Sequence, residues 1–485
     1  MYRKNDRTGE FDGFALAFGG KLRRDNRWVI LADAIPWNAI ENKYANLFQS
    51  KVGRPALSLR IAFGALLIKE RLNISDEETC EQIRENHYLQ YFLGYENYSD
   101  ELPFDPSLMV HFRKRLSLEI LSDVNELIIR QEKPEIEKQH KDDDDKGTGN
   151  KGTLIADATV APEAMRFPHD VMTLDEARQK TEQIIDVLHS KLTDGSIKPR
   201  TYRRQARKEF LGFIRNRKPK MRLIRRALKK QMQYVERNVR SINELSLKAS
   251  LLNLSKKQYR DLLVISEYVR QQRELYKTGE LEGHGRLVSI CKPHVRAIAR
   301  GKARAMYEFG AKVSASMVDG FARVERLSWD NFNEGIDLIE MIESYKKRYG
   351  HFPEVVCADK IYRNRKNLEY CKNNNIRLSG PKLGRPFKAG GRIKGQKKIE
   401  REDEATRVAI EGKFGEAKTC YTLDRIEMRL KETSETAIMM VFIVMNIARV
   451  IRARAAALFL FFRGFIRDIS ALARFVTSES IMQAV

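Results

Sequence analysis

Residues 152–162 read GTLIADATVAP, and residues 353–362 read PEVVCADKIY. Each stretch contains a short apolar run that leads into an aspartate, Asp157 in the first and Asp359 in the second. Short apolar runs of this kind predict buried β-strands. If the two strands are neighbours in one sheet, Asp157 and Asp359 lie side by side.

The pattern after residue 300 predicts an alternation of strands and helices. A hairpin is expected in residues 308–329, and Asp319, which precedes Gly320, is expected in its turn. An amphipathic helix ending at Gly350 follows, and the strand that leads into Asp359 comes next. A short helix in 364–375, a short strand in 376–382 and a long helix at about 402–419 complete the pattern. This order predicts an α/β fold with a sheet of mixed strand direction.

The remaining segments predict the domain organisation. Residues 175–299 form a long polar segment with a helical pattern. This segment predicts a helical insertion after the first strand. The predicted parts are a helical N-terminal DNA-binding domain (1–130), an acidic linker (131–150), the α/β domain (151–174 and 300–462), the basic helical insertion (175–299) and a C-terminal tail (463–485).

The N-terminal domain has weak signs of DNA binding. Helices are expected at residues 58–72, from Ser75, where a capping box begins, and from Asp105 onward. The last helix carries His111 and the cations Arg113, Lys114 and Arg115. Three short helices of this kind are typical of a helix-turn-helix DNA reader and equally of an ordinary helical domain.

The charge of the chain predicts a polyanionic partner. Lys and Arg number 89 against 65 acids, a formal net charge of +24. Residues 198–240 hold many Lys and Arg and two acids, Glu209 and Glu236. This block favours contact with DNA phosphates over a merely solvated helical surface. An acidic membrane is the less favoured partner.

Cysteine usage and hydropathy predict a cytoplasmic, nucleoid-associated protein. The five cysteines include no CxxC pair, which argues against a disulfide framework or a zinc ribbon. The N-terminus has no apolar signal-peptide core. The apolar run 437–445 is shorter than the roughly 20 residues that cross a bilayer, and it predicts a buried core helix with no membrane partner.

A third carboxylate, Glu411, lies in the stretch RVAIEGKFGEAKTCYTLDR, residues 407–425. At helical spacing, Arg407, Glu411 and Lys418 lie within about 40° of arc on one helix face. A solvated face with an Arg407–Glu411 pair explains the same spacing. Three carboxylates on separate elements suit two hard divalent ions and phosphoryl transfer.

The stretches around Asp157, Asp359 and Glu411 resemble the bacterial insertion-sequence transposases with a ribonuclease H-like DDE catalytic domain. The branch around the IS-four and IS-five elements is the most similar. Its helix motif has Tyr, Arg, Glu and Lys at fixed spacing, and Glu404 stands here in place of the Tyr. Residues 53–95, which begin GRPALSLRIAFG, are also similar to the helical domain of this branch.

The resemblance implies a fold, an activity and a set of functional residues. The α/β domain is expected to be ribonuclease H-like, and Asp157, Asp359 and Glu411 to be catalytic and to bind two Mg²⁺ or Mn²⁺ ions. The expected activity is cutting of element ends and joining of their 3′-hydroxyls to target DNA. The expected partners are the terminal inverted repeats, target DNA and a second copy of the chain, in a homodimer or larger complex. Arg407, Lys418, Arg113, Lys114, Arg115, Arg300 and Lys302 are the expected DNA-binding residues.

Other residues and functions stay as alternatives. Glu404 is an alternative metal ligand, and Glu308 is expected to be structural. The cations Arg300, Lys302 and Arg304 either touch DNA or form a solvated face. The alternative functions are a catalytically inactive, transposase-derived DNA-binding protein and a nuclease of the same fold.

Overall fold

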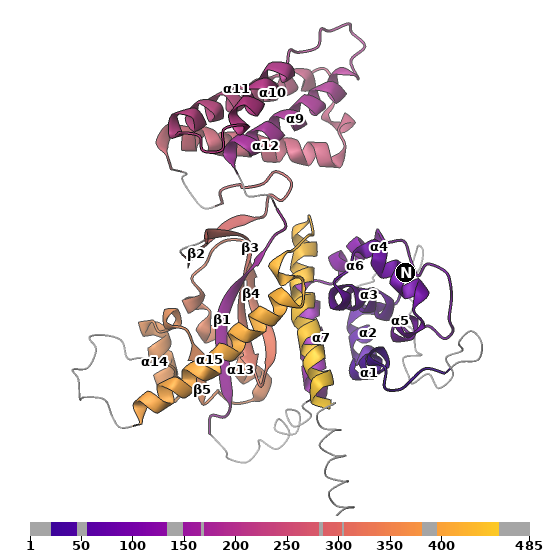
Figure 1. Ribbon diagram of the computed structural model, residues 1–485, viewed down its shortest axis with the longest axis vertical. Helices are drawn as coiled ribbons and strands as arrows, with labels where there is room; N and C mark the ends of the chain where they lie inside the picture. Colours follow the sequence, from indigo (N-terminus) through magenta and orange to yellow (C-terminus); the bar gives the residue numbers. More distant parts are fainter. Residues whose placement is uncertain are drawn as a thin grey trace, which may run out of the picture.

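The computed structural model describes residues 21–45, 56–132, 149–165, 169–280, 285–302, 305–380 and 395–454. Its N-terminal part is helical, a mixed sheet lies beside it, and helices α9–α12 form a unit beyond one end of the sheet (Figure 1). Most of the predicted linker 131–150 and the whole tail 463–485 lie outside the described residues.

The N-terminal helices begin and end largely where the sequence predicts. Ser58 accepts a hydrogen bond at the start of α3, and Asn73 ends that helix in the left-handed conformation. The predicted third helix is two helices, because Ser117 interrupts it and caps the second at the N–H of Ile120. The helices are α1 (Arg27–Ala34), α2 (Trp37–Ala45), α3 (Leu59–Leu72), α4 (Asp76–Glu85), α5 (His87–Phe92), α6 (Leu108–Arg115) and α7 (Leu118–Glu132).

The sheet has the mixed direction that the sequence predicts. Its strands are β1 (Thr153–Pro162), β2 (Arg296–Lys302), β3 (Ala305–Val318), β4 (Phe321–Ser328), β5 (Val355–Ala358) and β6 (Arg377–Leu378). Strand β1 is antiparallel to β3 and parallel to β5, which is parallel to β6. The long β3 pairs first with β2 and then with β4, both antiparallel. Strand β2 was not predicted, because its sequence RAIARGK alternates small and cationic side chains.

Two glycines are required by the backbone around β3. Asp319 and Gly320 have φ values of 51° and 77° between β3 and β4, so the predicted hairpin turn is confirmed. Gly310 lies where β3 meets the end of β1, and a Cβ there would lie 2.0 Å from the carbonyl oxygen of Ala161. A side chain at residue 310 would therefore push β1 and β3 apart.

Helices cover both faces of the sheet. Leu154 and Val356 face a core with α13 (Leu338–Tyr349) and α14 (Arg365–Asn373). Ile155 and Cys357 face the opposite core, with α15 (Gln396–Thr419) and part of the C-terminal helix. The two aspartates therefore lie on strands that are held by packing on both sides.

The C-terminal helix Lys431–Arg454 joins the sheet to the N-terminal helices. It is long and apolar enough to cross a membrane, but Ala437–Met445 are all buried inside the protein. One face packs on the sheet core and the other on the N-terminal helices. The buried Asn446 donates 2.8 Å to Asn125 of α7 and accepts 2.9 Å from the N–H of Ala322 of β4. The helix is thus a core element, as its sequence predicts.

Four helices lie between β1 and β2 and pack on one another. They are α9 (Asp170–His189), α10 (Arg203–Ile214), α11 (Met221–Ser246) and α12 (Lys256–Thr278). Apolar side chains from α9, α11 and α12 form two cores within this unit. Below, these helices are called the helical insertion.

A buried ion pair fixes the chain where the helical insertion returns to the sheet. Glu163 follows β1 and its side chain has no exposed surface, while Lys292 precedes β2. The Lys292 ammonium donates to the Glu163 carboxylate and lies 3.4 Å from the carbonyl oxygen of Ile426. A buried charge without its partner is strongly unfavourable.

We therefore predict that Glu163→Gln lowers the free energy of unfolding by about 3–5 kcal/mol, because Lys292 is left buried without a counter-charge. Urea unfolding of the full chain would measure this loss. The exposed neighbour Glu427 is the control, and Glu427→Gln is expected to change stability by less than about 0.5 kcal/mol. Equal unfolding midpoints for the two variants would contradict the prediction.

Candidate active site

Asp157 and Asp359 lie side by side at the centre of the sheet. Asp157 is within β1, and the preceding Ala156 is the register partner of Ala358 in β5. Asp359 follows Ala358 directly. Because β1 and β5 are parallel and in register, the two aspartates occupy neighbouring positions. The strand continues beyond Asp157 to Pro162, so this aspartate lies within the strand and not at its end.

The surroundings of Asp157 disfavour its charge. The pKa of its carboxyl is raised to about 6, chiefly by burial and also by the nearby carboxylates of Glu334 and Asp359. A hydrogen bond of 2.8 Å from the N–H of Ala158 and the charge of Arg407 act in the opposite direction. Asp157 is therefore a half-buried carboxyl among other carboxylates, which is typical of a functional site.

Helix α15 places Glu411 near these strands. Ile410, Phe414 and Ala417 are buried in the core that α15 shares with the sheet. Glu411 comes directly after Ile410, and its side chain is 50% exposed. The helix contacts β1 and β5, the strands that position the two aspartates.

Arg407 binds Glu411 directly and acts on Asp157 through its charge. One of its nitrogens donates 2.6 Å to Glu411 and the other donates 2.7 Å to Glu404. These hydrogen bonds raise the pKa of Arg407. The charge of the same guanidinium also lowers the pKa of Asp157.

The three predicted ligands do not form one cluster in this structure. Among the described residues, no group of three or more His, Cys, Asp or Glu side chains is close enough to hold a metal ion. Asp157 and Asp359 are together, while Glu411 is bound to Arg407. The physical reason is charge: carboxylates repel one another, and a guanidinium one helical turn away is the nearer counter-ion.

Sequence reasoning missed two residues beside Asp157. Glu334 begins η3 (Glu334–Ile336) after β4, and its carboxylate lies 2.5 Å from the ammonium of Lys312 on β3. The hydroxyl of Tyr362 is buried, and burial and the charges of Glu334 and Asp157 raise its pKa. Nothing in the local spacing marks these residues, because only the fold brings them to the aspartates.

The predicted DNA-binding residues have different surroundings. Arg113 is 4% exposed and its guanidinium donates to both carboxylate oxygens of Asp76, so its charge is already paired within the protein. Lys114 and Arg115 are exposed at the end of α6. Lys418 is half-buried on α15. Arg300 and Lys302 lie on β2, and their side chains, like residue 304, are outside the described part.

The structure also places the other carboxylates that the sequence analysis considered. Glu404 is 62% exposed and bound to Arg407, which lowers its pKa. Asp319 is in the hairpin turn, as predicted. Glu308 lies in the part of β3 that pairs with β2, away from the register position of Asp157.

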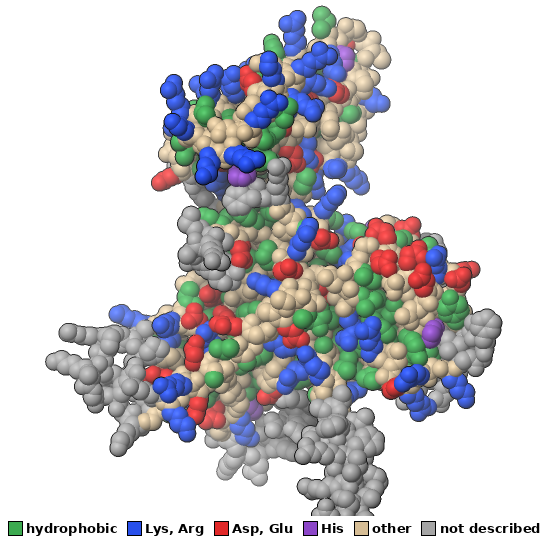
Figure 2. All heavy atoms as spheres, in the orientation of Figure 1, with side chains coloured by type: hydrophobic (Ala, Val, Ile, Leu, Met, Phe, Trp, Pro, Cys, Tyr) green, Lys and Arg blue, Asp and Glu red, His purple; other side chains and the backbone are tan. Residues whose placement is uncertain are grey.

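Acidic side chains gather over α4 of the N-terminal helices (Figure 2), where Asp76, Glu77 and Glu78 form the first turn. Lys and Arg side chains gather instead over α10 and α11 of the helical insertion (Figure 2). In residues 198–240, few of the cations have partners: Lys198 and Arg203 pair with Asp186, Lys230 pairs with Glu209, and Arg225 and Arg237 stack on tyrosine rings. A basic surface with few internal partners thus lies on the helical insertion.

The fold and the site define an α/β protein with paired carboxylates at the centre of a mixed sheet. Two parts of the chain match known protein families. Residues 356–448 match the family model described as "Transposase DDE domain", and residues 17–115 match "Transposase domain (DUF772)". The first match includes Asp359 and Glu411, and Asp157 precedes it. The two matches support an insertion-sequence transposase.

One curated relative is "Uncharacterized protein ORF8 in nfe locus" of Rhizobium meliloti, which is 36% identical over 96 residues. These residues are 20% of this chain and 46% of that protein, so the chain spans about half the length of this relative. No solved structure matches the chain.

The raised pKa of Asp157 predicts a pH-dependent difference in stability between the metal-free wild type and Asp157→Asn. As pH rises from 3.8 to about 6, the unfolded chain releases this proton before the folded chain does, and the wild type loses stability. The asparagine variant should therefore gain about 3 kcal/mol relative to the wild type over this range, with no further gain above it.

Urea unfolding in a chelating buffer at several pH values would measure this difference. Asp359→Asn serves as the matched control, because it also replaces an aspartate at the site by its amide. A wild-type to Asp157→Asn difference that is constant from pH 4 to pH 7, or that falls as pH rises, would contradict the assignment of a protonated Asp157 below about pH 6.

Proposed function

We propose that this protein is the DNA transposase of an insertion sequence, which cuts the ends of its element and joins their 3′-hydroxyls to target DNA. The observation that carries the proposal is the placement of Asp157 beside Asp359, with the Glu411 helix packed on the same two strands. The two transposase matches support it independently. Since transposition joins two element ends, we propose at least a dimer, acting in the cytoplasm on the nucleoid.

We further propose that the sheet is ribonuclease H-like. Strand β3 is antiparallel to both β1 and β4, β5 and β6 run parallel to β1, and α15 packs on β1 and β5. The helical insertion then interrupts the fold after its first strand. The branch around the IS-four and IS-five elements fits the spacing of Arg407, Glu411 and Lys418.

The residues at the site suit divalent metal ions. Carboxylate oxygens are the ligands that Mg²⁺ and Mn²⁺ prefer. Asp157 is costly to ionise because it is buried near Glu334 and Asp359, and a bound cation offsets such a cost. Asp157, Asp359 and Glu411 would hold two ions, which when bound activate the attacking oxygen and stabilise the leaving oxygen.

In this proposal, Arg407 controls whether the carboxylate of Glu411 is free to bind a metal ion. Its guanidinium now binds Glu411 and Glu404 and acts on Asp157 at the same time. A DNA phosphate is a bidentate acceptor that competes with carboxylates for arginine. In the proposed reaction, Arg407 and Lys418 bind the DNA backbone near the reacting end, and Glu411 is released toward the two aspartates.

The proposal predicts that Asp157→Asn, Asp359→Asn and Glu411→Gln each lower Mg²⁺-dependent cleavage of end-bearing plasmid by at least about 10³-fold, because each removes a metal ligand. DNA affinity should change little. Glu404→Gln is the matched control, since Glu404 lies on the same helix and binds the same arginine. Cleavage that survives in Glu411→Gln and fails in Glu404→Gln would move the third ligand to Glu404.

The alternatives differ in the products of the same assay. A nuclease of this fold would leave cut ends without joining them to target DNA. An inactive DNA-binding derivative would bind the ends and cut neither strand. The pairing of Glu411 with Arg407 makes this second alternative worth testing, because it keeps one carboxylate from the other two.

The helical insertion supports DNA as the partner. Arg222, Arg226 and Lys229 are exposed on α11, and their side chains have no ion pair or hydrogen bond within the described residues. We predict that changing all three to Gln reduces the steepness of the dependence of log affinity on log salt by about three. Fluorescence anisotropy with duplex DNA would measure both quantities.

The control for this test changes Arg270 and Arg273 to Gln, on α12 of the same helical insertion. Both are exposed but paired, with Glu267 and Glu236 respectively. Their loss should alter the salt dependence by less than about one. Equal effects in the two variants would show that the α11 cations do not contact DNA specifically.

A further inference from the structure

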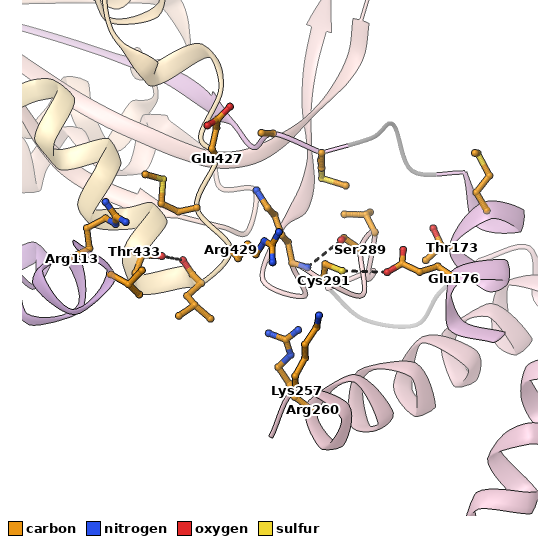
Figure 3. A pocket seen from close by; sticks show the side chains of 18 of the residues that line it. Arg113, Thr173, Glu176, Lys257, Arg260, Ser289, Cys291, Glu427, Arg429 and Thr433 are labelled. Atoms are coloured by element: carbon orange, nitrogen blue, oxygen red, sulfur yellow. Dashed lines mark hydrogen bonds between the residues drawn. The ribbon is translucent and has the colours of Figure 1, made fainter. Parts of the chain in front are cut away.

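A cleft of about 1240 Å³ lies where the helical insertion meets the rest of the protein. One wall comes from α9 and α12, a second from the ends of α3, α4 and α6, and a third from residues 427–433 before the C-terminal helix (Figure 3). The residues that line it do not include Asp157, Asp359 or Glu411. The cleft is therefore a site separate from the paired aspartates.

Six Lys or Arg side chains line this cleft, and three of them (Lys69, Arg113 and Lys292) are paired with Asp76 or Glu163. The other three come from two different parts of the chain. Lys257 and Arg260 come from the first turns of α12, and Arg429 comes from the segment before the C-terminal helix (Figure 3). Lys257 and Arg429 are exposed, and neither side chain has a hydrogen bond or ion pair within the described residues.

Arg260 is only partly satisfied. It lies 2.9 Å from Asp261, but Asp261 also binds Lys180 at 2.6 Å. The Nε atom of Arg260 is buried without a hydrogen-bond partner. Lys257, Arg260 and Arg429 are therefore not fully neutralised by their own neighbours.

Most acids of the cleft already have cationic partners. Asp76 pairs with Arg113, Asp175 with Arg178, and Glu176 with Lys180 at 3.5 Å. Cys291 donates to the same Glu176 at 3.3 Å (Figure 3). Glu77 of α4 also lines the cleft and is exposed. Glu427, on the same wall as Arg429, pairs with Arg425 at 3.6 Å. The acids of the cleft therefore leave Lys257, Arg260 and Arg429 without a full counter-charge.

Lys257, Arg260 and Arg429 carry like charges in one cleft, and an anion bound between them would reduce their mutual repulsion. The N-terminus of α12 adds its own partial positive charge on the side of Lys257. The volume of the cleft exceeds the roughly 300–1,000 Å³ of small-molecule sites, so a segment of polymer fits better than a metabolite. Phe210 of α10 also lines the cleft and joins it to the basic surface of α10 and α11.

We propose that this cleft binds the phosphate backbone of DNA, held by Lys257 and Arg260 on one side and by Arg429 on the other. The inference rests on the proposed function for its choice of polyanion, but it requires no catalysis. The bound strand links the helical insertion to the segment before the C-terminal helix. Contacts to phosphates alone make this binding independent of base sequence.

The test compares DNA binding by the full chain and by the double variant Lys257→Gln, Arg429→Gln. Anisotropy titrations use a duplex of unrelated sequence, without divalent metal, at several salt concentrations. The double variant should lose affinity roughly tenfold at about 0.1 M salt and reduce the slope of log affinity against log salt by about two. An element-end duplex should show the same loss.

Lys256→Gln is the matched control. Lys256 precedes Lys257 in the same helical turn but does not line the cleft. It should change affinity by less than about twofold. Urea unfolding midpoints equal to the wild type would show that the variants are folded.

The outcomes distinguish a failure of the DNA-binding cleft from a failure of the proposed function. If the wild type binds DNA and the folded double variant binds equally well with the same salt slope, the cleft is not a DNA site and the proposed function stands. If Lys256→Gln weakens binding as much as the double variant does, the cleft has no special role and the inference is again wrong. If the wild type binds no DNA, the inference and the proposed function are both wrong.

Discussion

The parallel pairing of β1 with β5 is the contact on which the site depends. Residues before Asp157 and before Asp359 pair rung by rung from Thr153 with Val355 to Ala156 with Ala358. A slip of one residue would turn one aspartate to the opposite face of the sheet. The register is held because Leu154 and Val356 fill one core while Ile155 and Cys357 fill the other. Packing on both faces therefore places two repelling carboxylates together.

The C-terminal helix makes the N-terminal helices and the sheet one structure. Its Met439 and Ile443 pack among N-terminal side chains, while Ile438 and Phe442 pack in the sheet core. The buried Asn446 adds hydrogen bonds to both partners, which fixes the rotation of the helix about its own axis. The helix Lys431–Arg454, which is apolar enough to cross a membrane, packs between these two cores.

The sequence predicted what depends on local periodicity and caps. The apolar runs before Asp157 and Asp359, the Asp319-Gly320 turn and the helix that carries Glu411 are all visible in the order of residues. Strand β2 was missed because its alternating cations and alanines lack the apolar strand pattern.

The rest of the site depends on contacts between residues far apart in the chain. Arg113 has the same local appearance as its exposed neighbours, and only its pairing with Asp76 on another helix buries it. The carboxylate of Glu334 acts on Asp157 because Glu334 follows β4, a strand of the same sheet. The binding of Glu411 by Arg407 was foreseen as one of two interpretations of the same spacing, and charge repulsion between carboxylates decides it.

The two ends of the helical insertion leave the sheet at nearly the same place. Pro162 at the end of β1 and Arg296 at the start of β2 are both register partners of Gly310, on opposite edges of β3. With neighbouring strands about 5 Å apart, the gap between these ends is about 10 Å, which three or four extended residues can span. The helical unit is thus a detachable module: a short joint could replace it and leave every strand pairing of the sheet intact.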